Sequence, residues 1–151
     1  MAQFELGSVS TGTLRTQDLL ESFASALNGL YKVHPLVPQA LDLLSMDDWS
    51  DEQSYQASDI TEEISDALNE LCPPFVFFGA HPGDGADYGF WPDMDGLEEA
   101  MSNAKGHACC LKLPDDSVCL PDDGVVVQVS DHGNVTVMDR DSSYHVIWSV
   151  V

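Results

Sequence analysis

Basic residues are what this sequence lacks most. Lysine and arginine together number 5 among 151 residues, against 26 aspartates and glutamates, and neither occurs between Lys32 and Lys105. The formal net charge is −21. A field of this sign repels nucleic acid and anionic membranes and attracts basic protein surfaces. We therefore expect no direct binding to nucleic acid or to a membrane, and a basic protein as the partner.

Long apolar runs and export signals are also missing. No apolar run approaches the roughly 18 residues of a membrane-spanning helix, and the first five residues lack the basic and apolar regions of a signal peptide. The cysteines are few and include an adjacent pair that cannot conveniently bridge to the other two: Cys72, Cys109, Cys110 and Cys119. We interpret them as reduced thiols, mostly small buried apolar side chains, in a cytoplasmic protein.

The remaining composition predicts a folded chain. Apolar residues make up 44%, with three Trp, six Phe and four Tyr, whereas disordered acidic segments are poor in aromatics. We expect a single domain over 1–151, with a loose lead-in at 1–14, a mainly helical part at 16–72 and mainly strands at 75–151. This order predicts the α+β class, with N-terminal helices packed on a C-terminal, mainly antiparallel sheet of about four to six strands.

Helical periodicity marks the N-terminal part. Apolar residues recur at helical spacing after Thr16, a predicted N-cap, and a short second helix is expected over 38–45. Residues 47–55 are interpreted as a loop or a helix start. A third helix is predicted to open at Ser58 and Asp59, where Asp59 forms a capping-box pattern with Glu62, and to stop before Pro73.

Strand patterns dominate after residue 74. The apolar run 75–78 predicts a strand, the glycine-rich stretch 79–92 a compact loop, and residues 95–103 one or two helical turns. Residues 131–134 form a good hairpin turn between two valine-rich strands, and the chain closes with a further strand. The last three strands are expected at 125–129, 135–138 and 145–151.

The third helix carries a one-signed polar face. Its acids step by three or four residues: Asp59, Glu62, Glu63, Asp66 and Glu70. Along the axis they lie roughly 4.5–6 Å apart, against about 3.4 Å for the charges of one DNA strand. No lysine partners them, although like charges at this spacing cost helix stability. This pattern favours a surface that imitates a phosphate backbone over an ordinary solvated helix face, although adaptation to high salt or solubility alone would also produce acidity.

The glycine-rich stretch allows a second type of site. His81, Asp84 and Asp87 are spaced by three and carry imidazole and carboxylate ligands that suit a divalent metal. The favoured interpretation is structural: these side chains bond the loop's own backbone amides while Phe90 and Trp91 fill the core.

Other chemistry has little support. The Cys109, Cys110, Cys119 and His107 group lacks the Cys-x-x-Cys spacing of zinc sites, and the chain has no nucleophile motif and no phosphate-binding glycine loop. We expect no enzymatic activity and no cofactor.

Two phrases and the chain end resemble a known group of proteins. The stretches 78–91 (FGAHPGDGADYGFW), 129–136 (VSDHGNVT) and 147–151 (IWSVV) are similar to small acidic proteins of bacteriophages and mobile elements that carry no assigned function. The likeness covers roughly 72–92 and 125–151 and transfers no catalytic residue. It implies a setting, because small acidic phage proteins often resemble inhibitors of host defence that occupy a DNA- or RNA-binding groove.

The leading hypothesis is a non-enzymatic nucleic-acid mimic in the host cytoplasm that binds a basic surface of a host defence or DNA-handling protein. Its alternatives are a small metal- or ligand-binding domain centred on the His81, Asp84 and Asp87 loop, and a phage accessory or structural protein. Tyr55 is a further candidate aromatic anchor beside the predicted partner-binding residues. Those residues are Asp47, Asp48, Trp49, Asp51, Glu52, Asp59, Glu62, Glu63, Asp66 and Glu70.

Overall fold

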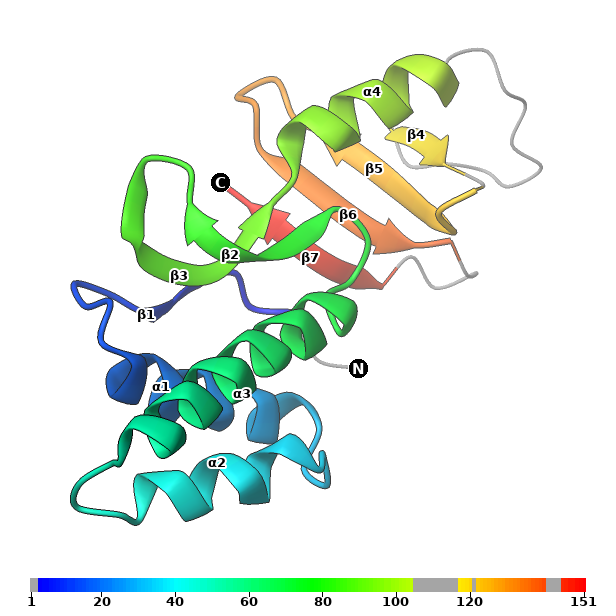
Figure 1. Ribbon diagram of the computed structural model, residues 1–151. Helices are drawn as coiled ribbons and strands as arrows, with labels where there is room; N and C mark the ends of the chain where they lie inside the picture. Colours follow the sequence, from blue (N-terminus) through cyan, green and yellow to red (C-terminus); the bar gives the residue numbers. More distant parts are fainter. Residues whose placement is uncertain (1–2, 105–116, 121, 141–144) are drawn as a thin grey trace. The chain divides into compact units, whose positions relative to one another are not determined.

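The computed structural model describes residues 3–104, 117–120, 122–140 and 145–151, and these contain four helices and two antiparallel sheets of three and four strands (Figure 1). The predicted α+β class is confirmed, with helices mostly N-terminal and the four-stranded sheet C-terminal. In chain order the elements are β1 (Gly7–Ser10), α1 (Thr16–Leu30), α2 (Leu36–Leu44), α3 (Asp51–Glu70), β2 (Val76–His81), β3 (Asp84–Pro92), α4 (Met94–Ala104), β4 (Ser117–Leu120), β5 (Val125–Val129), β6 (Val135–Asp139) and β7 (Val146–Val150).

The chain divides into two compact units whose segments alternate along the sequence. The helical unit comprises Gly7–Cys72 and Val76–Trp91. The sheet unit comprises Met1–Leu6, Pro73–Phe75 and Pro92–Val151. The expectation of a single domain over the whole chain stays a prediction.

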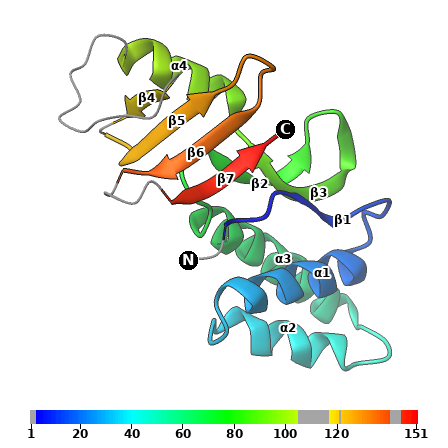
Figure 2. The ribbon, with the colours of Figure 1, turned by 180° about the vertical axis from the view of Figure 1, so that it is seen from behind.

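The helical unit is held by the apolar faces of α1 and α3. α1 packs against α2 and α3, and α3 also packs against β2 (Figures 1 and 2). Phe23 of α1 lies at the centre, 2% exposed, with its ring centroid 5.0 Å from that of Phe78 and 5.4 Å from that of Tyr88. Burying large aromatic and aliphatic side chains in this way stabilises the fold by roughly 1.5–3 kcal/mol each. The buried residues of the two helices are Leu20, Phe23, Ala24, Leu27, Ala57, Ile60, Thr61, Ile64 and Leu68.

The predicted N-cap of α1 is off by one residue. Arg15 occupies the cap position with extended backbone angles, and its side chain makes no capping hydrogen bond. The Thr13 hydroxyl supplies the local support instead, since it accepts from Arg15 N (3.2 Å) and donates to Asp18 Oδ2 (2.7 Å). Thr16 is therefore the first helical residue.

The predicted start of α3 at Ser58 and Asp59 is wrong, because the helix begins at Asp51, within the stretch 47–55 that was interpreted as a loop or a helix start. Ser50 is the N-cap: its hydroxyl accepts from Gln53 N (3.3 Å) while Ser50 N donates to Gln53 Oε1 (2.9 Å). This reciprocal pair satisfies two amide groups that a helix start leaves without partners. The Asp59 and Glu62 pattern lies inside the helix, where no capping group is needed.

The stretch predicted as a glycine-rich loop is a hairpin made of β2 and β3, and β3 also pairs with β1 to give the sheet order β1-β3-β2. Phe90 is buried as expected, whereas Trp91 is half-buried and donates its indole N–H to Gly79 O (3.0 Å). β1 lies within the predicted loose lead-in, with Ser8 opposite Gly89 in the ladder. A Cβ on Gly89 would collide with the carbonyl oxygen of Gly7, so glycine here permits close strand pairing.

The sheet unit is built on the strand order β4-β5-β6-β7, with α4 packed on β4. The predicted hairpin is confirmed, because β5 and β6 flank a turn closed by Ser130 N donating to Asn134 O (2.9 Å). Trp148 of β7 is 0% exposed and donates its indole N–H to Pro74 O (2.8 Å). The edge strand β7 also receives the N-terminal segment, where Phe4 N donates to Ile147 O (2.7 Å).

Some expectations lie outside the described residues. Cys109 and Cys110, with His107 and the two lysines at 105 and 112, fall in the stretch 105–116. No helix within the described ranges is both long and apolar enough to cross a membrane.

Candidate acidic interface

One side of α3 carries all of its carboxylates. At 3.6 residues per turn they fall within roughly a third of the helix circumference, opposite the buried stripe. All are exposed, and the row spans about 28 Å along the axis. We call this surface the acidic face; its residues are Asp51, Glu52, Asp59, Glu62, Glu63, Asp66 and Glu70.

No basic side chain among the described residues neutralises the acidic face. The salt bridge of Arg15 joins Asp18 on α1, at 3.9 Å. The helical unit, every residue of which is described, has fourteen carboxylates and two basic side chains, Arg15 and Lys32, and so a formal net charge of −12. On α3, five carboxylate pairs stand three or four residues apart, and each costs about 0.2–0.5 kcal/mol. The packing of the opposite face offsets that repulsion.

The two aromatic candidates have different surroundings. Trp49 is half-buried and donates its indole N–H to Leu43 O (2.9 Å). This bond joins the segment just before α3 to α2. Tyr55 is 75% exposed and lies about one turn from both Asp51 and Asp59, within the acidic face. Tyr55 is therefore the aromatic side chain that is open to a partner. The remaining predicted residues, Asp47 and Asp48, are exposed just before the helix.

The His81, Asp84 and Asp87 side chains are not assembled into a metal site. His81 Nδ1 accepts from Gly83 N (3.0 Å), and Asp84 Oδ1 accepts from the backbone N–H two residues later (3.0 Å). Asp87 Oδ1 is buried without a hydrogen-bond partner. Within the described part of the chain, no three His, Cys, Asp or Glu side chains form a group that could hold a metal ion. The bonds of His81 and Asp84 to backbone amides agree with the structural interpretation of this stretch, whereas the unpartnered Oδ1 of Asp87 does not.

A pocket beside the acidic face was not anticipated from the sequence. Its volume is about 210 Å³, and it lies in the helical unit between α1, α3 and β3. Glu62 lines it and also belongs to the acidic face. We call it the hydroxyl pocket, because most of its polar lining is hydroxyl: Thr16, Ser58, Thr61, Ser65 and Tyr88. The spacing of Ser58 and Ser65, two helical turns apart on one side of α3, was the available sequence signal.

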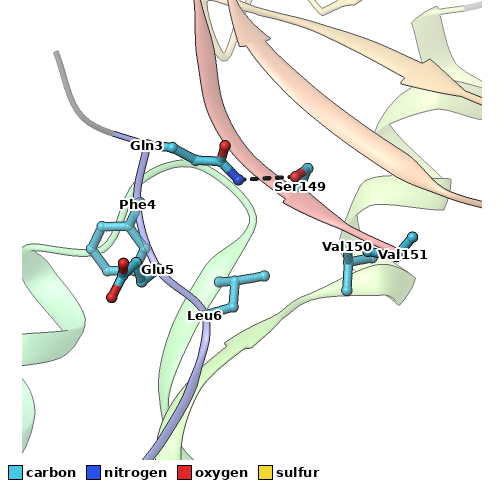
Figure 3. A pocket seen from close by; sticks show the side chains of 7 residues that line it. All are labelled: Gln3, Phe4, Glu5, Leu6, Ser149, Val150 and Val151. Atoms are coloured by element: carbon cyan, nitrogen blue, oxygen red, sulfur yellow. Dashed lines mark hydrogen bonds between the residues drawn. The ribbon is translucent and has the colours of Figure 1, made fainter.

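A second pocket lies in the sheet unit, beside the edge strand β7. It has a volume of about 790 Å³ and is lined by residues 3–6 and 149–151 (Figure 3). Gln3 Nε2 donates to Ser149 Oγ across it (2.9 Å). Glu5 is the sole ionisable side chain among the lining residues, and the hydroxyl of Ser149 has Gln3 rather than Glu5 as its hydrogen-bond partner. The lining therefore shows no hydrogen-bonded pair of a nucleophile and a base.

Among the free thiols of the described residues, Cys72 has a pKa that is clearly shifted by burial. Burial raises the pKa of Cys72 to about 11, and its Sγ donates to Leu68 O at 3.3 Å. Since the thiolate is the nucleophile, the raised pKa lowers the reactivity of Cys72 near neutral pH. Cys72 is half-buried, which agrees only in part with its interpretation as a small buried apolar side chain.

No protein-family model, curated protein or solved structure matches this chain.

Proposed function

We propose that this protein is a non-enzymatic inhibitor that binds the basic, nucleic-acid-binding surface of a host defence or DNA-handling protein. The acidic face of α3 carries the proposal, since its carboxylates are exposed, extend over about five turns and are unopposed by any basic side chain among the described residues. The phage or mobile-element origin and the host cytoplasm rest on the resemblance of residues 78–91 and 129–136.

Electrostatics supports this mode of binding. A basic groove that accepts duplex DNA presents lysines and arginines to a row of negative charges, and the carboxylates of α3 supply a similar row. In the free protein these carboxylates repel one another. A basic partner replaces that repulsion with attraction, so binding gains from both changes, and it weakens as salt screens the charges.

Tyr55 supplies the apolar part of the contact. An exposed tyrosine surrounded by carboxylates buries a large ring at small cost in side-chain entropy, as interface anchors do. Asp47 and Asp48 extend the negative surface beyond the first turn of α3.

The test is capture of heparin-binding proteins from a bacterial lysate on the immobilised protein, followed by elution with duplex DNA. We expect retention at about 0.05 M NaCl, loss at about 0.5 M, and displacement by DNA. The triple variant Glu62→Lys, Glu63→Lys and Asp66→Lys should retain at least about tenfold less protein, equivalent to about 1.4 kcal/mol.

The chain offers a matched control on α4. Asp95, Glu98 and Glu99 are exposed acids of the sheet unit, and their reversal to lysine changes the net charge by the same amount. If both triple variants lose retention equally, net charge explains the binding and the acidic face does not. Retention that DNA cannot displace would also overturn the proposal.

A further inference from the structure

We propose that the hydroxyl pocket binds the guanidinium group of an arginine side chain presented by the basic partner. The identity of that partner rests on the proposed function, whereas the preference of the pocket for arginine follows from its own residues.

Three segments of the helical unit build the pocket. Ser58, Glu62 and Ser65 stand at i, i+4 and i+7 on α3, so their side chains share one side of the helix. Thr16 comes from the start of α1 and Tyr88 from β3. The buried ring of Phe23 also lines the pocket and lies against that of Tyr88.

The lining offers many acceptors and one negative charge. The hydroxyls of Ser58 and Ser65 and the carboxylate of Glu62 make no hydrogen bond to another described residue. Thr61 donates its hydroxyl hydrogen to Ala57 O (2.7 Å), which leaves the lone pairs of its oxygen as acceptors. A ligand that donates from several points and carries a positive charge fits this arrangement.

Guanidinium satisfies these conditions better than ammonium. Its planar fork has five N–H donors, pairs with a carboxylate in two parallel hydrogen bonds, and stacks on aromatic faces such as that of Tyr88. An ammonium is a compact, strongly hydrated point charge. The volume of about 210 Å³ is several times the roughly 30 Å³ share of one water, so a side chain has room to enter.

An anion is excluded by the surrounding charges. The start of α1, where Thr16 lies, favours negative ligands through the helix dipole. However, Asp18 in the first turn already interacts with this end, and Glu62 lines the pocket itself. The net charge of −12 on the helical unit adds to the repulsion of anions.

The direct test is titration of N-acetyl-arginine amide into the ¹⁵N-labelled protein, followed by NMR. We expect saturable shifts at the amides of Ser58, Ser65 and Tyr88. N-acetyl-citrulline amide, which has nearly the same shape without the charge, should bind at least about tenfold more weakly, and N-acetyl-lysine amide should also bind more weakly. Absence of localised shifts, or equal binding of citrulline or lysine, would overturn the proposal.

Variants separate this inference from the proposed function. Ser65→Leu fills the pocket without changing charge and should abolish arginine binding, and Glu62→Gln, which keeps the side-chain shape, should weaken it several-fold. Glu63→Gln, on the acidic face outside the pocket, should leave it unchanged. If arginine amide binds but no DNA-displaceable protein is retained, the proposed function fails alone; DNA-displaceable retention without arginine binding removes the pocket inference alone.

Discussion

Replacing Asp66 with lysine should stabilise the protein. Asp66 takes part in three of the five like-charge pairs of α3, with Glu62, Glu63 and Glu70. Each pair costs about 0.2–0.5 kcal/mol when repulsive and contributes a similar amount when attractive. Conversion of three pairs therefore raises the free energy of unfolding by about 1–3 kcal/mol at low salt.

Urea denaturation followed by helix circular dichroism measures this gain. At about 0.01 M salt the Debye length is near 30 Å, and at about 1 M it is near 3 Å, so the gain should be large in the first condition and small in the second. Asp66→Asn, which removes the repulsions without adding attractions, should show about half of the gain. Unchanged or lower stability at low salt would refute the assignment of Asp66 to a self-repelling surface. The same lysine variant should bind the basic partner less, so stability and binding change in opposite directions.

Three further changes probe packing and ionisation. Gly89→Ala should lower the free energy of unfolding by roughly 1–3 kcal/mol because the added methyl strikes the β1 backbone, whereas Gly85→Ala, with nothing within 4 Å of the added carbon, should change the urea midpoint little. Trp148→Phe should cost about 2–4 kcal/mol, since it leaves Pro74 O without its donor and opens a cavity; a midpoint equal to that of the parent would contradict this. Cys72 should react with iodoacetamide at pH 8 at least about tenfold more slowly in the folded than in the unfolded protein, by peptide mapping. Because its pKa rises from 9.0 to about 11 on folding, its contribution to stability should be constant below pH 9 and fall between pH 9 and 11.

Local sequence patterns predicted the elements that depend on local chemistry. The period of apolar residues placed α1 and α2, and the turn residues at 131–134 placed the β5–β6 hairpin, because both signals act over a few neighbouring residues. The acidic side of α3 followed from the same periodicity, although the helix starts earlier than expected. Two capping patterns occur in that stretch, and only the Ser50 and Gln53 pair forms reciprocal hydrogen bonds.

Features that depend on distant residues were not predicted. The strand β1 has no pattern of its own and exists because Ser8 lies opposite Gly89, about eighty residues away. Glycines at 79–92 indicated a loop, whereas Gly89 serves close approach of two strands. The residues that line the hydroxyl pocket lie on α1, α3 and β3, so no single stretch of the sequence predicted it.

The alternation of the two units along the chain has a consequence for synthesis on the ribosome. Every residue of the helical unit has been added once Trp91 is in place. The sheet unit then still lacks Trp148, which donates a hydrogen bond to Pro74 O, and Ile147, whose carbonyl accepts one from Phe4 N. At about 5–20 residues per second, some 3–11 s separate Trp91 from Trp148. The nascent chain can therefore complete the acidic face before the last strand of the sheet unit is made.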